Sequence, residues 1–169
     1  PHFTIPENGK FSLMDRSWYQ DVSIRALADK LPERCIKKRL EDIRRFERTL
    51  TDNGYLILKF FLHISKREMK TRLKALAANP ETAFRAVKSD WKQVKRYDEY
   101  YAAFDRMITE TNTSESPWTI VSSTDRRAAT VQVFRAVIHA ISDRLAHPAT
   151  ATSVSLPNAL TSDAALRLA

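Results

Sequence analysis

An almost uninterrupted apolar run, YLILKFFLHIS, occupies residues 55–65. A strand covered on both faces has this composition, because neither of its sides meets water. Helical patterns lie on either side of the run: apolar residues recur at helical spacing over 32–51, and Ser65 with Glu68 forms the S-x-x-E pattern of a helix N-terminus. A buried strand between two helices predicts a parallel α/β sheet.

The remaining segments repeat this alternation. Short apolar runs predict buried strands at 11–15 and 118–123, and apolar spacing predicts helices at 65–79, at 89–108 and at 124–146. The side chains expected to point inward from the four helices are Ile36, Leu40, Ile43, Phe46 and Leu50; Met69, Leu73 and Leu76; Trp91, Val94, Tyr97, Tyr101, Phe104 and Ile108; and Phe134, Val137, Ile138, Ile141 and Leu145.

A length of 169 residues suits one domain, which we expect over residues 1–147. Residues 148–169 change to Ala, Thr, Ser and Leu without clear periodicity and are expected to be a linker or tail. The single cysteine, Cys35, cannot form an internal disulfide and favours a reduced, cytoplasmic protein. No stretch of 18 apolar residues is present, so we expect no membrane span.

The positive charge of the chain is concentrated in one segment. The chain has a net charge of +8, and the 38 residues from Lys59 to Arg96 hold eleven basic and three acidic side chains. The other residues hold 17 of each sign and are neutral. A surface that binds a polyanion has this distribution, although most charged runs are simply solvated helix faces, and nucleic acid is a competing polyanion.

Polar side chains follow each of the three predicted strands. They are Asp15 with Arg16, the segment from His63 to Lys66, and the segment from Ser123 to Arg127. Ligands of parallel sheets bind outside the carboxyl ends of the strands, so we expect the three groups to share one site. Asp15 could hold Mg²⁺ beside phosphates and Arg16 could neutralise a phosphoryl group; alternatively, Asp15 only caps the helix that follows.

Several long phrases, in order over about residues 11–146, resemble the polyphosphate kinase 2 family. They are DRSWY, FERTLTDNGYLILKFFLHISKREMKTRL, SDWKQVKRYDEYYAAFDRMITETNT, PWTIVSSTDRR and FRAVI. They are most similar to one domain of the fused, two-domain polyphosphate:AMP phosphotransferases. The resemblance implies a P-loop kinase fold related to thymidylate kinase, in which a parallel sheet flanked by helices carries a helical lid. It also implies phosphoryl transfer between inorganic polyphosphate and a nucleotide with Mg²⁺.

The resemblance assigns roles to individual residues. Asp15 falls on the Walker B aspartate that coordinates the metal, and Arg16 on the phosphate-binding arginine beside it. The lid corresponds to about residues 65–96, and Asp125, Arg126 and Arg127 match a D-K-R phrase that we expect to bind nucleotide or phosphate. Within the lid, the basic positions expected to meet polyphosphate are Lys66, Arg72, Arg85 and Lys92.

The chain also departs from the family pattern. The Walker A loop, which precedes the Walker B strand in the family, is absent from these 169 residues, and the only glycines are Gly9 and Gly54. We therefore expect the chain to be part of a longer protein and inactive alone. Asp21 and Arg25 stand where the family usually has an arginine and a glutamate, while Phe84 and Ala128 replace a tryptophan and a tyrosine.

Two functional hypotheses follow. The first is a phosphotransferase domain acting between polyphosphate and AMP or ADP, with a second domain of the same family in the protein and a homo-oligomeric assembly. The second is a degenerate, non-catalytic copy with a structural or polyphosphate-binding role. Nucleic-acid binding is the least favoured alternative, because the family phrases occur in order.

Overall fold

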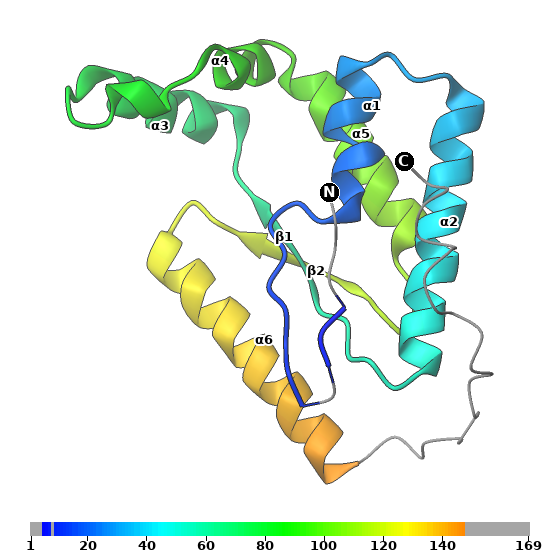
Figure 1. Cartoon of the computed structure of the whole chain (residues 1–169). Helices are drawn as coiled ribbons and strands as arrows, with labels where there is room; N and C mark the ends of the chain where they lie inside the picture. Colours follow the sequence, from blue (N-terminus) through cyan, green and yellow to red (C-terminus); the bar gives the residue numbers. More distant parts are fainter. Residues whose placement is uncertain (1–4, 8, 148–169) are drawn as a thin grey trace.

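The computed structural model describes residues 5–7 and 9–147 (Figure 1). The linker or tail expected at 148–169 lies outside the described residues. At the centre, β1 (Lys59–His63) and β2 (Trp118–Ser122) pair in parallel, with Lys59 opposite Trp118 and His63 opposite Ser122. The other elements are η1 (Trp18–Asp21), α1 (Ile24–Ala28), α2 (Glu33–Asp52), α3 (Lys66–Ala78), η2 (Ala83–Arg85), α4 (Lys88–Lys95), α5 (Tyr97–Thr111) and α6 (Arg126–Ala146).

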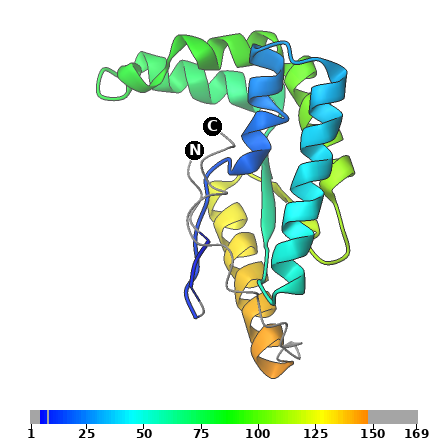
Figure 2. The same cartoon turned by 45° about the vertical axis from the view of Figure 1, so that its right-hand side comes forward.

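The two strands lie between α6 on one side and the pair α2 and α5 on the other (Figures 1 and 2). This layering confirms the expected α/β class with a small parallel sheet. The buried core is formed by η1, α2 and α5, and its central side chains are Tyr19, Val22, Leu40, Ile43 and Met107. Leu40 and Ile43 belong to the apolar stripe predicted for this helix, so burial of that stripe fixes α2 against α5.

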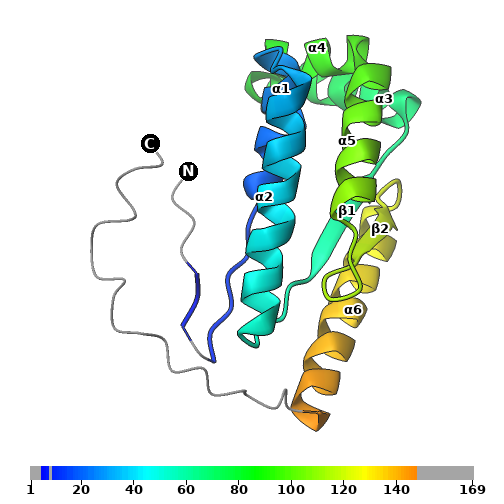
Figure 3. The same cartoon turned by 90° about the vertical axis from the view of Figure 1, so that its right-hand side faces the viewer.

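Residues 65–96, called the arm below, project from the strands as an antiparallel pair of helices, α3 and α4 (Figures 2 and 3). Ser65 caps α3 by accepting a hydrogen bond from the Glu68 N–H at 3.2 Å, as the S-x-x-E pattern predicts. Leu73 is buried, and Met69 and Leu76 are half-buried, as expected. The capping box is only half formed, however, because the Glu68 carboxylate binds Arg72 at 2.7 Å instead.

The long helix expected at 89–108 is two helices. Arg96 leaves the helical region, with φ −104° and ψ 25°, and separates α4 from α5. Its guanidinium binds both carboxylate oxygens of Glu99, at 3.0 and 2.7 Å, and lies over the ring of Tyr100. The apolar stripe continues across this break, so periodicity alone does not reveal it. The break redirects the chain from the arm to the helix layer beside the sheet (Figure 1).

The buried strand predicted at 11–15 is wrong. Residues 11–14 have no regular secondary structure, and Phe11 and Leu13 are 92% and 96% exposed. A strand buried on both faces needs a paired neighbour and helices on either side. Within the described residues the sheet contains only β1 and β2, which pair with each other. The apolar run therefore lies alongside the sheet without joining it.

The predicted inward face of the last helix is also wrong. Ala129 is the buried residue of α6, whereas four of the five expected inward side chains are exposed: Phe134, Ile138, Ile141 and Leu145. The helix packs on β2 near its N-terminal end, and no described element covers its outer apolar stripe. None of the described helices is both long enough and apolar enough to span a membrane.

Candidate functional site

Two of the three polar strand ends meet. The N–H of Ser123, after β2, donates to the carbonyl of His63, the last residue of β1, at 2.8 Å. The Arg72 guanidinium then joins the arm to the same point by donating to the carbonyls of Ser123 (2.6 Å) and Thr124 (2.8 Å). The carboxyl ends of both strands and the first helix of the arm therefore form one hydrogen-bonded unit.

The third polar group, Asp15 with Arg16, is not joined to this unit by any hydrogen bond or ion pair among the described residues. Both side chains are exposed, and both lie in a turn rather than at the end of a strand. Arg16 and the next residue, Ser17, have φ angles of 62° and 43°, which are left-handed conformations that non-glycine residues rarely adopt. The three groups therefore do not all lie at strand ends as expected: only the ends of β1 and β2 are joined, and their sharing of one ligand site stays a prediction.

Asp125, Arg126 and Arg127 lie where β2 passes into α6. The Asp125 carboxylate is the helix cap and accepts hydrogen bonds from the N–H groups of Arg127 (2.8 Å) and Ala128 (3.1 Å). The two arginines occupy the first turn and are exposed. Exposed guanidinium groups at the positive end of a helix dipole are suited to a phosphate ligand.

The basic residues of the arm fall into two groups. Lys66, Arg72 and Arg96 are paired with acidic side chains, Asp98, Glu68 and Glu99 respectively. Seven others are exposed and have no acidic partner among the described residues: Arg67, Lys70, Lys74, Arg85, Lys88, Lys92 and Lys95. Two of the four expected polyphosphate-binding residues, Arg85 and Lys92, thus belong to the unpaired group.

The other two expected polyphosphate-binding residues take structural contacts at the base of the arm. Lys66 binds Asp98 at 2.7 Å and lies 5.8 Å from the centre of the Tyr97 ring, while Arg72 binds the strand ends. The Tyr97 hydroxyl donates to the carbonyl of Ile64 at 3.0 Å. Burial, followed by the nearby Tyr101 and Asp98, raises the pKa of the Tyr97 hydroxyl, so it remains a donor at neutral pH.

A buried polar network was not expected from the sequence. Glu47 of α2 is 1% exposed and binds Lys59, the first residue of β1, with 2.9 Å between the carboxylate and the ammonium group. The Glu47 carboxylate also accepts hydrogen bonds from Trp18, Tyr19 and Ser116. The one sequence signal for it is Lys59 itself, a charge inside an apolar run, because a buried charge requires a partner.

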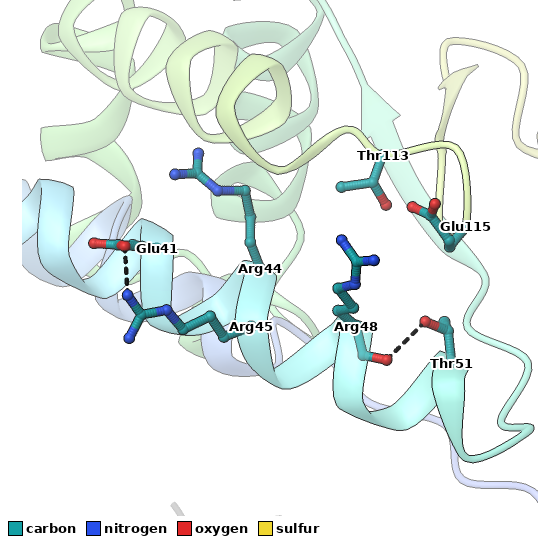
Figure 4. Close-up of a pocket in the computed structure, with 7 residues that line it drawn as sticks. All are labelled: Glu41, Arg44, Arg45, Arg48, Thr51, Thr113 and Glu115. Carbon is teal, nitrogen blue, oxygen red and sulfur yellow. Dashed lines mark hydrogen bonds and ion pairs between the residues drawn. The ribbon is translucent and has the colours of Figure 1, made fainter.

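A second basic surface lies on α2, away from the arm (Figure 4). It is a pocket of about 340 Å³ lined by Glu41, Arg44, Arg45, Arg48, Thr51, Thr113 and Glu115. Arg44 binds Glu110 at 3.1 Å, Arg45 binds Glu41 at 2.6 Å, and Arg48 lies 3.8 Å from Asp52. These arginines are therefore compensated by carboxylates, in contrast to the seven unpaired cations of the arm.

Among the described residues, no group of three or more His, Cys, Asp or Glu side chains could hold a metal ion. Asp15 is an exposed carboxylate with no hydrogen bond or ion pair in that part of the chain. Mg²⁺ commonly takes one or two carboxylates and completes its shell with water and substrate phosphates. Asp15 fits that mode of binding as a single protein ligand.

The chain combines parallel strands, helices on both sides of them and an arm with seven cations that are unpaired among the described residues. These features define a class of α/β proteins that present cations at the carboxyl ends of strands. Within that class, this chain belongs to the polyphosphate kinase 2 family, because the family profile, described as Polyphosphate kinase 2 (PPK2), matches residues 2–148.

Two curated relatives have related names. An AMP/ADP-polyphosphate phosphotransferase of Meiothermus ruber is 38% identical over 120 residues, which cover 71% of this chain and 45% of the relative. A polyphosphate:AMP phosphotransferase of Pseudomonas aeruginosa is 30% identical over 142 residues, 84% of this chain and 29% of the relative. The chain thus spans less than half the length of these relatives.

Two solved structures share the fold. A polyphosphate kinase 2 from Arthrobacter aurescens TC1 aligns with a TM-score of 0.71 at 26% identity, over 87% of this chain and 49% of that one. A putative polyphosphate kinase 2 from Pseudomonas aeruginosa aligns with a TM-score of 0.79 at 29% identity, over 85% of this chain and 31% of that one.

Proposed function

We propose that this chain is part of a phosphotransferase that moves a phosphoryl group between inorganic polyphosphate and AMP or ADP with Mg²⁺. The observation that carries the proposal is the arm, in which seven exposed cations have no acidic partner among the described residues. Polyphosphate is a linear polyanion, and a row of uncompensated cations can bind it along its length. The names of the curated relatives, which include polyphosphate and AMP or ADP, support the same substrates.

In this proposal each group of residues has a separate task. The arm, including Arg85 and Lys92, binds polyphosphate, while Arg126 and Arg127 bind phosphates at the start of α6. Arg16 stabilises charge on the transferring phosphoryl group, since a guanidinium matches two phosphate oxygens. Asp15 would hold Mg²⁺, which when bound offsets the negative charge of the phosphates.

The nucleotide phosphates need a further element. A P-loop kinase cradles them in a Gly-rich loop, and these 169 residues contain no such loop. We therefore infer that the loop is supplied from outside this sequence and that the chain alone does not turn over. A second family domain, a homo-oligomeric assembly and a cytoplasmic location belong to the same proposal.

The competing proposal is a degenerate copy that binds polyphosphate without turnover. It rests on the departures from the family pattern, among them the reversed charges at Asp21 and Arg25, which follow Asp15 in the sequence. In the structure these two side chains pair with each other, with 3.0 Å between Arg25 Nη1 and Asp21 Oδ1. The reversal therefore leaves neither charge isolated, and an exposed pair of this kind is compatible with both proposals.

The test is ADP formation from AMP and polyphosphate by a full-length protein that carries this sequence. We expect turnover in the wild type and its loss in Asp15→Ala, because the metal ligand is removed. Asp42→Ala is the matched control, since Asp42 is also an exposed aspartate without an ion pair in the described region. Polyphosphate binding without turnover in the wild type would instead establish the degenerate copy.

A further inference from the structure

The turn that carries Asp15 and Arg16 is followed immediately by two anchored aromatic residues. Trp18 Nε1 donates to Glu47 Oε1 at 3.0 Å, and the Tyr19 hydroxyl donates to the same oxygen. Both donors belong to η1, whereas Glu47 belongs to α2 and is 1% exposed. A buried carboxylate 28 residues away along the chain therefore holds the segment next to the proposed metal ligand.

The second carboxylate oxygen fixes Glu47 from the other side. Glu47 Oε2 accepts from Lys59 Nζ at 2.9 Å and from the Ser116 hydroxyl at 3.2 Å. Lys59 also donates to the carbonyl of Thr111 at 2.6 Å and lies 5.3 Å from the centre of the Trp118 ring. The Lys59 ammonium, itself held by Thr111, therefore orients the carboxylate relative to the sheet, and the Ser116 contact is the longest of the four.

The backbone before η1 needs such support. Arg16 and Ser17 have φ angles of 62° and 43°, and residues in this region persist only where their surroundings hold them. Asp15 and Arg16 have no side-chain hydrogen bond or ion pair of their own among the described residues. The Ser17 hydroxyl has one weak contact, 3.5 Å to the sulfur of Met14. The hydrogen bonds of the next two residues, Trp18 and Tyr19, to Glu47 tie the segment after the turn to α2.

We propose that Glu47, oriented by Lys59, is a positioning residue that holds the Asp15–Arg16 turn in the geometry used for phosphoryl transfer. Glu47 touches neither substrate nor metal; it acts through Trp18 and Tyr19. The claim that the turn takes part in phosphoryl transfer rests on the function proposed above. The claim that Glu47 orders the turn does not. The two can therefore be measured separately.

The test compares two single hydroxyl deletions on the same carboxylate. Tyr19→Phe removes a donor that restrains the turn, and Ser116→Ala removes a donor from the opposite side of Glu47. Backbone ¹⁵N order parameters of Asp15, Arg16 and Ser17 are measured on the 169-residue chain. We expect wild type and Ser116→Ala to give values near those of rigid backbone, about 0.85, and Tyr19→Phe to fall below about 0.6.

Activity is then measured in the full-length protein. We expect Tyr19→Phe to lower kcat about tenfold with KM for polyphosphate unchanged, and Ser116→Ala to keep kcat within about twofold, at matched thermal stability. Equal order parameters in the two variants, or a turn already flexible in the wild type, would overturn the positioning role. A wild type without turnover would remove the proposed function but leave the order-parameter result standing.

Discussion

Lys59 and Glu47 form an ion pair whose side chains are 3% and 2% exposed. Removing two charges from water is costly, and their attraction offsets the cost only when both are fully hydrogen-bonded. Here the carboxylate accepts four hydrogen bonds, and the ammonium group has a second acceptor in the Thr111 carbonyl. Within the described residues, no buried side-chain nitrogen or oxygen lacks a partner. The pair therefore specifies how α2, β1 and η1 fit together.

Lys59→Met tests this pair at the level of stability. The substitution keeps the apolar stem but leaves the Glu47 carboxylate buried without its counter-ion, so we expect the free energy of unfolding to fall by about 3–5 kcal/mol. Urea denaturation of the 169-residue chain measures it. Lys38→Met is the control on an exposed lysine and should change stability by less than about 0.5 kcal/mol. If Lys59→Met lost no more unfolding free energy than the control, the ion pair would not stabilise the fold as proposed.

The difference in stability between wild type and Lys59→Met should also depend on pH. Burial lowers the pKa of Lys59 below its usual 10.5, although the hydrogen bond to Glu47 opposes the shift. The unfolded chain therefore holds this proton more tightly than the folded chain, and stability increases with pH in the window between the lowered pKa and 10.5. We expect the stability advantage of wild type over Lys59→Met to grow there, by at most about 1.4 kcal/mol per pH unit.

The sequence pointed to half of this pair. Lys59 is conspicuous inside an apolar run. Its partner Glu47 could not be predicted, because helical periodicity does not define the buried face to within one residue. Phe46 was expected to point inward from α2, whereas it is 37% exposed and the next residue, Glu47, is buried. One step along a helix rotates a side chain by about 100°. An apolar stripe therefore defines a face but does not identify a buried acid at its edge.

At the scale of elements, Arg72 shows how a helix of the arm is tied to the sheet. Its guanidinium donates to Glu68 and to the carbonyls of Ser123 and Thr124, and its side chain is 23% exposed. The resemblance assigned this arginine to polyphosphate binding. Such an assignment rests only on the basic residue type at this position. Its contacts make it a link between α3 and the turn before α6, and its role toward polyphosphate stays a prediction.

Two substitutions separate these roles. Arg72→Lys keeps the positive charge but cannot reproduce a planar group that reaches two carbonyls and a carboxylate. If Arg72 is a link, Arg72→Lys should lose about 1.5–3 kcal/mol of unfolding free energy, because charged hydrogen bonds are lost. Arg67→Lys, on an exposed arginine of the same helix, should be neutral within about 0.5 kcal/mol. An Arg72→Lys chain of unchanged stability would return Arg72 to the polyphosphate-binding group.

At the scale of the whole molecule, the alternation of strands and helices was predictable from the sequence. Which of the predicted strands join the sheet was not. The runs at 55–65 and 118–123 contain the paired strands β1 and β2, which the helices cover only in part, because Leu62 and Ile120 are 59% and 50% exposed. The run at 11–15 is also apolar from Phe11 to Met14 apart from Ser12, but it pairs with no strand among the described residues, and no described element covers the apolar stripe on α6. An apolar pattern shows which side chains of a segment could be buried. Whether they are buried also depends on a neighbouring element, which the pattern does not predict.

The site was predictable to a similar degree. Residue types at strand ends predicted that the segments after the two strands meet, as His63 and Ser123 do, because the carboxyl ends of parallel strands lie at one edge of the sheet. Which cations of the arm are free could not be read from sequence. Lys66 is paired with Asp98 of another helix and Arg72 with Glu68 of its own helix, and only the folded arrangement shows that Arg85 and Lys92 have no such partner among the described residues.

The distribution of charge leads to a prediction for the whole molecule. Binding of polyphosphate to the unpaired cations of the arm should weaken steeply with salt, because each exposed contact is screened and displaces counterions. The double variant Lys70→Ala/Lys74→Ala removes two such cations, so it should bind less tightly and with a shallower dependence of affinity on salt. Fluorescence titration with labelled polyphosphate at several ionic strengths measures both quantities.

The control for this titration is the basic pocket on α2 (Figure 4). Arg45→Ala/Arg48→Ala removes the same net charge from the chain, but these arginines lie 2.6 Å from Glu41 and 3.8 Å from Asp52. If unpaired cations bind the polyanion, the control keeps the wild-type salt slope. If net charge alone governs binding, the two double variants behave alike, and the arm is not the binding surface. The comparison thus separates a site built from uncompensated cations from a general attraction between a basic protein and any polyanion.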